Sequence, residues 1–402
     1  MAKGTEALVK PSLLVWARQS AGYKTIEAAA QKARFATDQL ESWENGDSRP
    51  TVNQLRKLSH IYNRPLAVFY LSEPPKDFDA MRLRDYRRLP DAVKSGESPE
   101  LRAEIRRASY RRELVLELTE DWEDVPQHLE ASASLLENIE RVGARIRELL
   151  GIPLEEQVRW RGEYAALSNW RFALEDAGVL VFQAWGIDIR EMRGFSLTER
   201  PFPVIVVNAK DSPRGRIFSL MHELTHILLH DSGLCDLSYV REPRSTNLLQ
   251  VERFCNSAAA AALVPKDDLL TQPLVARKPN RTARWSWEEL RALSSHYEVS
   301  EQALLRRLLT LNRIDDGFYW QTLKGLQRRY KTKKKADSSS SGGPPPSEKA
   351  VSIAGQLFTE VVLESYNEER ITSADLSDYL EVRLKHIPRI EELVRRKATT
   401  QR

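Results

Sequence analysis

The sequence predicts a mainly helical protein of several domains, with one small α+β domain near the middle of the chain. Three observations support this fold class. Short stretches with helical spacing and capping residues cover most of the 402 residues. Only two runs, at 179–186 and 204–208, have the β-branched and aromatic residues typical of strands. Breaks rich in proline, glycine or serine separate the helical groups, which indicates separate units.

The composition is that of a folded protein without a membrane segment. Hydrophobic residues make up 41% of the chain, yet no run approaches the roughly 20 apolar residues that span a bilayer. The N-terminus lacks the apolar core of a secretory signal. With only two cysteines, Cys235 and Cys255, a disulfide framework is implausible and we expect a cytoplasmic protein. The formal net charge of +4 permits nucleic-acid binding but does not require it.

Five short helices are predicted between residues 11 and 72. Thr25 caps a helix over 26–33, and Thr37 caps the next one, which a glycine at position 46 ends. Thr51 starts a helix over 52–62, and a last short helix follows Pro65. So many short helices in so few residues predict a compact all-α domain.

Residues 73–158 are charged and mostly helical in pattern, and we interpret them as an arginine-rich connector. The arginines at 82–112 either contact nucleic acid or form a solvated helix face with neighbouring glutamates. The sequence leaves both interpretations open.

The α+β domain is expected at 159–275. A helix over 159–177 precedes the two strands, a long helix runs from Pro213 towards Gly233, and a second long helix ends at Pro265. Beyond it we predict a helical extension at 276–330 and a helical C-terminal segment at 350–402. Between them, residues 331–349 are predicted to be a flexible linker, because serine, glycine and proline cannot bury a core.

The most informative pattern is H-E-x-x-H at 222–226, within the first of these long helices. His222 and His226 are one helical turn apart, so both imidazoles project from one face and can bind one metal ion. Glu223 is rotated from them by about 100°. Its carboxylate is therefore expected to act as a general base towards water rather than as a ligand.

A catalytic zinc needs a third protein ligand and an open position. Glu252 is the favoured candidate, because it opens the second long helix and is followed by alanines that allow close packing. Glu242 and His230 are its rivals. His/His/Glu chemistry favours Zn²⁺ over manganese. Asn256 is expected to hold a ligand by a hydrogen bond. Cys255 is either a ligand or a small buried residue. Tyr239 and His230 are candidate donors to the oxyanion.

These residues resemble the ImmA/IrrE metallopeptidases. Members carry an R-x-x-F-S-L-type lead before the H-E-x-x-H pattern, and the comparable segment at 214–220 here reads R-G-R-I-F-S-L, with one more residue before the phenylalanine. Later they carry a glutamate that opens a helix ending in proline. The chain departs from the family pattern at Cys255 and Val264, without loss of a ligand or base. The resemblance implies a small zincin-like domain, zinc at His222, His226 and Glu252, catalysis by Glu223, and a repressor protein as substrate.

The N-terminal stretch resembles the XRE (Cro/phage-repressor-like) helix-turn-helix domain, with a recognition helix at 37–44. This helix carries three acidic residues and neither lysine nor arginine, which is unusual for contact with DNA phosphates. The candidate DNA contacts are Thr37, Gln39 and Ser42 for bases, and Arg34 and Arg49, with Lys32 and Arg56, for phosphates. A module that binds a repressor, or a second copy of the chain, is the alternative.

The sequence therefore predicts a zinc endopeptidase of the H-E-x-x-H type that cleaves a repressor-type protein and carries an attached DNA-binding domain. The alternative is a DNA-binding regulator or antitoxin whose peptidase-like domain is a sensor or is inactive.

Overall fold

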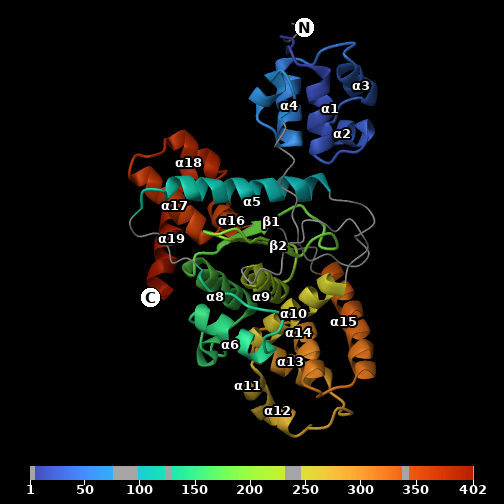
Figure 1. Ribbon diagram of the computed structural model, residues 1–402, viewed down its shortest axis with the longest axis vertical. Helices are drawn as coiled ribbons and strands as arrows, with labels where there is room; N and C mark the ends of the chain where they lie inside the picture. Colours follow the sequence, from blue (N-terminus) through green and yellow to red (C-terminus); the bar gives the residue numbers. More distant parts are fainter. Residues whose placement is uncertain (1–4, 76–97, 123–128, 231–245, 337–343, 402) are drawn as a thin grey trace. The chain divides into compact units, whose positions relative to one another are not determined.

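The computed structural model describes residues 5–75, 98–122, 129–230, 246–336 and 344–401 (Figure 1). The chain divides into two compact units, of which the first ends at Ser109 and the second begins at Tyr110. The architecture is mainly helical with one three-stranded sheet, so the predicted fold class is confirmed. Within the described ranges, no helix combines the length and apolar character needed to cross a bilayer.

The first unit is built from short helices around a small apolar core. They are α1 (Pro11–Ser20), α2 (Ile26–Ala33), α3 (Thr37–Asn45), α4 (Val52–Tyr62), the 3₁₀ helix η1 (Leu66–Tyr70) and the first half of α5 (Pro99–Leu118). As predicted, the Thr25 and Thr51 side chains cap α2 and α4, and Gly46 ends α3 in the left-handed region.

The predicted cap at Thr37 is wrong. Thr37 is the first helical residue of α3, and Ala36 occupies the N-cap position without a side-chain hydrogen bond. Phe35 packs edge-on against Trp43, with ring centroids 5.2 Å apart. Helix α3 thus begins at Thr37 itself, one residue earlier than the capping pattern indicates.

A buried ion pair ties α1 to α3. The guanidinium of Arg18 donates to both carboxylate oxygens of Glu44, at 2.8–3.1 Å, and also to the backbone oxygen of Tyr23. The Glu44 carboxylate raises the pKa of Arg18 against the opposing effect of burial. Glu44 is therefore held inside this unit by Arg18 and does not present its charge to a DNA groove.

The first half of α5 packs on the helices of this unit. Glu100 pairs with Lys32 at 2.6 Å, and Arg106 donates to the backbone oxygen of Ser20 at 3.5 Å. Both contacts reach other helices of this unit. The local kind of ion pair, within α5 itself, is formed by Arg107 and Glu104 at 2.9 Å. Residues 76–97 of the connector lie outside the described residues.

The second unit contains the sheet, in the order β1–β3–β2. Strand β1 (Leu180–Ala184) is parallel to β3 (Val204–Asn208), and β2 (Gly194–Leu197) is antiparallel to β3. Both predicted strands are present, but the prediction of only two was wrong. Strand β2 has four residues, all buried, and its mixed sequence gives neither the alternation nor the length of a recognisable strand.

Alternate residues of β1 face two helical layers. Val181 belongs to the core shared with α8 (Glu163–Asp176) and α9 (Pro213–His230). Phe182 packs edge-on against Phe358 of α17 (Gln356–Asn367), with centroids 5.9 Å apart. In Figure 1 the sheet accordingly lies between α8 and α9 on one side and α16 and α17 on the other. The period of two along the strand produces this layering.

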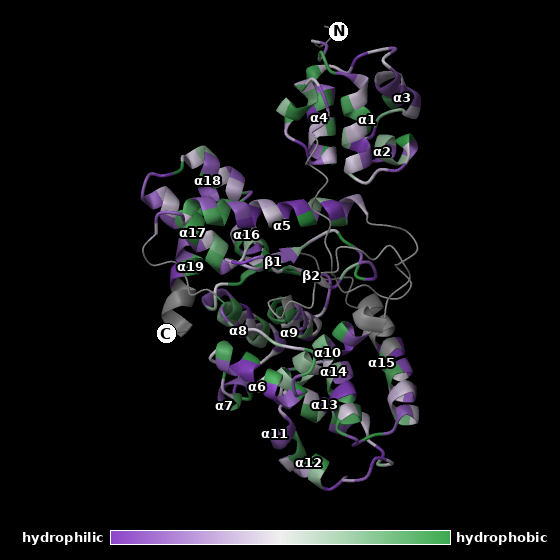
Figure 2. Ribbon diagram, in the orientation of Figure 1, coloured by the Kyte–Doolittle hydropathy of each residue, from purple (hydrophilic) through white to green (hydrophobic). Residues whose placement is uncertain are grey.

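Helix α9 is covered in turn by α10 (Thr246–Leu263), which packs against α6 (Ile139–Leu149). Figure 2 shows apolar residues over much of α10 and hydrophilic residues along α5. The remaining helices are α7 (Leu154–Gln157), α11 (Lys266–Thr271), α12 (Pro273–Ala276), α13 (Trp287–His296), α14 (Glu301–Thr310), α15 (Asp316–Ala336), α16 (Pro346–Ala354), α18 (Ser373–Tyr379), η4 (Leu384–His386) and α19 (Ile387–Gln401).

The linker predicted at 331–349 is helical at both ends, which corrects that expectation. Helix α15 continues to Ala336, because its lysines and alanine are good helix formers. Helix α16 already begins at Pro346, a proline at the first helical position, where the missing N–H costs nothing. Residues 337–343 lie outside the described residues.

Candidate metal centre

Two histidines of α9 form the base of the site. His222 and His226 are both buried, and their rings lie 4.8 Å apart between centroids. The two Nε2 atoms are 3.1 Å apart. The i, i+4 spacing on one helix places both rings on the same face of α9. The sheet, α8 and α10 pack around this helix.

Glu252 of α10 completes the group. Its Oε2 lies 3.5 Å from Nε2 of His222, and its Oε1 lies 3.3 Å from Nε2 of His226. One ligand atom from each of the three residues can be chosen so that all lie within 4.8 Å of one another. The third ligand favoured from the sequence therefore stands beside both histidines, although it is 26 residues further along the chain from His226.

The arrangement fits a zinc ion. Two nitrogens bound to zinc at about 2.0–2.1 Å in tetrahedral geometry are roughly 3.3 Å apart, close to the separation observed here. Two imidazoles and one carboxylate are the ligand set of many catalytic zinc sites. The histidines are almost fully buried, whereas the Glu252 side chain is 37% exposed. Solvent and a substrate can thus reach the group from the side of Glu252.

The local charges also favour a cation. Burial disfavours the imidazolium of His226, but its neighbours outweigh this effect, and the pKa of His226 is raised well above its usual value. Cys255, Glu252 and Glu223 are the groups responsible. Burial raises the pKa of the Cys255 thiol, and His226 opposes this effect.

Glu223 lies beside the histidines and is completely buried. Its Oε2 accepts a hydrogen bond of 2.9 Å from the hydroxyl of Ser196 on β2. Gly194, two residues earlier on the same strand, leaves room for this carboxylate. A Cβ at position 194 would lie 3.3 Å from Oε1 of Glu223 and 3.1 Å from the backbone oxygen of Val206.

Ser196 and Gly194 are the residues of the site that were not predicted from the sequence. They lie 27 and 29 residues before Glu223, on a strand too short to be recognised. No spacing rule relates a serine on an unrecognised strand to a glutamate on a helix. Only the pairing of β2 with β3 brings them together.

Close packing positions α10 and hence Glu252. Gly143 of α6 lies directly against α10, and a Cβ there would come within 2.7–2.8 Å of Ala261 and Ala262 atoms. The alanines at 258–262 are all buried. Small residues on both helices thus allow the close approach that the alanine run in the sequence predicts.

The end of α10 is held by three buried side chains. Arg147 donates to the backbone oxygen of Ala262 at 2.8 Å, and Gln157 donates to that of Leu263 at 3.0 Å. Arg307 donates to the backbone oxygen of Val264 at 2.8 Å. Carbonyls at a helix C-terminus lack intrahelical partners, and these side chains satisfy them.

The remaining predicted site residues differ from expectation or fall outside the described ranges. The amide of Asn256 donates to the backbone oxygen of Glu252 at 2.7 Å, so it fixes the main chain of the ligand rather than its carboxylate. The side chain of His230, and all of Cys235, Tyr239 and Glu242, lie outside the described residues.

The candidate DNA contacts lie on the first unit, and their side chains differ in solvent exposure. Arg34, Gln39 and Arg49 are exposed, and Thr37 and Ser42 are partly buried. The Ser42 hydroxyl lies 2.7 Å from that of Ser48. Among the flanking cations, Lys32 is paired with Glu100, and Arg56 donates to Asn53 at 3.4 Å.

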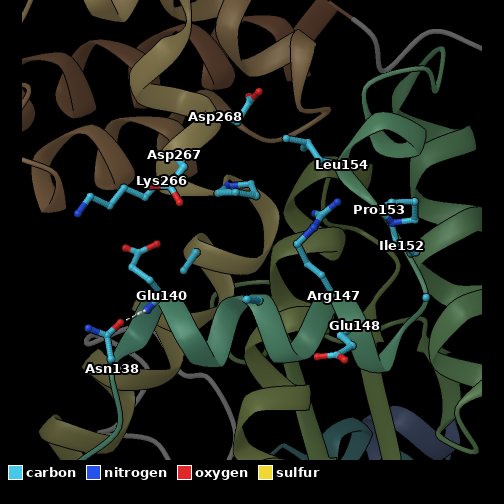
Figure 3. A pocket seen from close by; sticks show the side chains of 14 residues that line it. Asn138, Glu140, Arg147, Glu148, Ile152, Pro153, Leu154, Lys266, Asp267 and Asp268 are labelled. Atoms are coloured by element: carbon cyan, nitrogen blue, oxygen red, sulfur yellow. Dashed lines mark hydrogen bonds between the residues drawn. The ribbon is translucent and has the colours of Figure 1, made fainter.

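A separate cavity of about 850 Å³ lies between α6, α7 and the start of α11 (Figure 3). Arg147, Glu140 and Lys266 are among its lining residues, and Arg147 points into it from α6. None of the described metal-centre residues lines this cavity. This cavity is therefore separate from the candidate metal centre formed by His222, His226 and Glu252.

The fold and the site define the class of protein: a mainly helical chain with a metallopeptidase-type domain in its second unit. Residues 175–309 match the family model for the IrrE N-terminal-like domain, Peptidase_M78. The match includes β1 to β3, α9 and α10, and with them His222, Glu223, His226 and Glu252, and it covers about a third of the 402 residues. It supports the predicted ImmA/IrrE relationship for this region. No curated protein matches the chain.

Proposed function

We propose that this protein is a zinc-dependent endopeptidase that cleaves a repressor-type regulatory protein. The convergence of His222, His226 and Glu252 next to the buried carboxylate of Glu223 supports this proposal most strongly. The match to an IrrE-like peptidase domain supports the reaction class. A repressor as substrate follows from the family resemblance and from a first unit that resembles repressor domains.

His222, His226 and Glu252 would hold the metal. When bound, Zn²⁺ supplies Lewis acidity, which polarises a carbonyl group and lowers the pKa of a water from about 15.7 to about 7. Glu223 takes the proton of the attacking water and later delivers it to the leaving amine. The hydroxyl of Ser196 holds Oε2 of Glu223, so the carboxylate keeps one orientation for both transfers. Glu223 and the histidines are buried and the Glu252 side chain is partly exposed, so water and substrate would approach from the side of Glu252.

A comparison of new protein N-termini in cells tests this function and identifies the substrate at the same time. Cells that make the wild-type chain are compared with cells that make Glu223→Gln. Glutamine keeps the size of the side chain, so zinc binding is expected to remain. Its amide cannot accept the proton of the attacking water. We expect a small set of new N-termini in regulatory proteins only with the wild-type chain. Identical N-termini in both cultures, with zinc bound in both proteins, would contradict the proposal.

DNA binding by the first unit is the second part of the proposal. The exposed Gln39, with Arg34 and Arg49 nearby in the sequence, supports base and phosphate contacts. The burial of Glu44 against Arg18 removes one of the three acidic charges that argue against it. If DNA binding is found and no proteolysis is, the alternative function applies: a DNA-binding regulator or antitoxin whose peptidase-like domain is a sensor.

A further inference from the structure

A second hollow, of about 590 Å³, lies in the C-terminal helical part of the second unit. Three segments form its walls: α5 through Arg111, α16 through Pro346 to Ile353, and the stretch from the end of α18 through η4, residues 380–386. A pocket of this volume lies within the range for small-molecule sites. None of its described lining residues belongs to the candidate metal centre.

The lining is strongly cationic. Arg111, Lys349, Arg383 and Lys385 are basic residues, and His386 also lines the hollow. Among the described residues that line the hollow, Glu381 is the only acidic one. Several positive side chains from different segments around one concavity create a local field that attracts polyanions.

Arg111 gives this hollow a fixed cationic wall. Its side chain is only 3% exposed, and its guanidinium lies 5.2 Å from the ring centroid of Phe182 and 5.5 Å from that of Phe358. Its Nη2 contacts Oε1 of Glu381 at 3.3 Å, and the Glu381 side chain is 52% exposed. Packing against the two aromatic rings thus fixes the guanidinium of Arg111. The Glu381 carboxylate is exposed to solvent, so an anion that binds the guanidinium more strongly can displace it.

We propose that this hollow binds a small ligand that carries two or more phosphate groups. A planar guanidinium at the wall and flexible lysines at the rim are the groups that proteins use for phosphate. Lys349 also lies 5.3 Å from the ring centroid of Trp185, which is 46% exposed, so an aromatic surface adjoins the rim. A concavity closed by three segments suits a small polyanion better than the extended backbone of DNA. This inference is independent of the proposed peptidase activity.

Calorimetric titration of the full chain with inorganic pyrophosphate and with ADP tests the site. We expect saturable binding of at least one probe, and affinity that falls as salt concentration rises. The Lys349→Gln/Lys385→Gln variant should bind at least about tenfold more weakly, because it removes two side chains that can form charge-assisted hydrogen bonds to phosphate. Both lysines are exposed, so this variant should fold normally.

A matched control removes two positive charges elsewhere. Arg161 and Lys324 are exposed and do not line the hollow, so Arg161→Gln/Lys324→Gln should bind pyrophosphate and ADP as the wild type does. Equal weakening in both double variants would show a non-specific charge effect and overturn the proposal. Absence of binding by either probe at millimolar concentration would also overturn it. So would duplex DNA binding that depends on Lys349 and Lys385 without pyrophosphate or ADP binding.

Discussion

Ser196 is the residue that fixes the direction of the proposed general base. Its hydroxyl donates to Oε2 of Glu223 at 2.9 Å inside a buried site, and it lies on β2 rather than on either of the helices that carry the metal ligands. A carboxylate without this donor can rotate about its terminal torsion, which is a soft angle. Ser196 therefore acts through Glu223 and not on the metal.

Ser196→Ala should lower kcat about tenfold, because one buried hydrogen bond to a charged group contributes about 1.5–3 kcal/mol. We expect KM and the zinc content to stay near their wild-type values, because the ligands and the entrance are untouched. Ser196→Thr keeps the hydroxyl and should restore most of kcat. Initial rates at several concentrations of the purified substrate, with known enzyme concentration, separate kcat from KM. A loss of zinc in Ser196→Ala would show instead that the serine stabilises the metal centre.

A second residue-scale prediction concerns Tyr23 in the first unit. Burial, with a smaller effect of Glu100, raises the pKa of Tyr23 to about 12. The folded chain therefore keeps a phenol proton that the unfolded chain loses near its ordinary pKa of about 10. This stabilisation is complete below about pH 10 and is lost as the pH rises through about 12.

Tyrosinate absorbance during an alkaline titration of the native protein measures this shift. Tyr23→Phe should remove one of the tyrosines that ionise late, near pH 12, and should leave those that ionise near pH 10 unchanged. Loss of an early-ionising tyrosine instead would place the Tyr23 hydroxyl in water.

At the scale of single residues, the site residues that could be predicted from the sequence are those spaced by one helical turn. The i, i+4 rule places His222 and His226 on one face of α9, and the structure has their Nε2 atoms 3.1 Å apart. Glu252 could be favoured only because a run of alanines with helical propensity follows it. The expectation that it opens this helix was wrong, since α10 begins at Thr246 and Glu252 lies in its second turn. Ser196 could not be found, because its contact with Glu223 depends on strand pairing and not on spacing.

At the scale of elements, the approach of α6 to α10 sets the position of Glu252. Gly143→Ala would raise helix propensity, which by itself stabilises a helix by about 0.5–1 kcal/mol. The new methyl group would, however, lie 2.7 Å from the Cβ of Ala261 and 2.8 Å from backbone atoms of α10. Overpacking of this kind costs about 1–3 kcal/mol, so packing should win over propensity.

Urea unfolding of the full chain tests that balance. Gly143→Ala should lower the midpoint of the transition reported by the second unit, and it should weaken zinc binding because α10 must shift. Ala144→Ser, on the exposed side of the same helix, is the matched control and should leave both unchanged. A higher midpoint in Gly143→Ala would mean that α6 and α10 are not in this close contact.

Elements with local signals were predicted better than elements that depend on distant partners. The caps at Thr25 and Thr51 lie beside the helices that they start, and both are confirmed. Strand β2 was missed because its four residues are stabilised by β3 and α9 rather than by their own pattern. The helix over 331–336 was missed because a basic helix end and a basic linker have the same composition.

At the scale of the whole molecule, the two units have separate chemistry, and the proposed DNA binding belongs to the first. Gln39→Ala should weaken binding to a duplex selected from a random pool by about tenfold, since one base contact discriminates by about 1–3 kcal/mol. Gln19→Ala, on the exposed face of α1, is the matched control and should bind as the wild type does. Fluorescence anisotropy at several salt concentrations measures both. Equal affinity for all three proteins would favour a protein-binding role for this unit.

The metal content of the purified full chain tests the central claim most directly. We measure zinc in the wild type, in Glu252→Ala and in Glu242→Ala, the latter removing the rival third ligand. The account predicts about one zinc per chain in the wild type, its loss in Glu252→Ala and its retention in Glu242→Ala. A wild-type chain that holds no zinc after reconstitution, or one that keeps its zinc without Glu252, would contradict it.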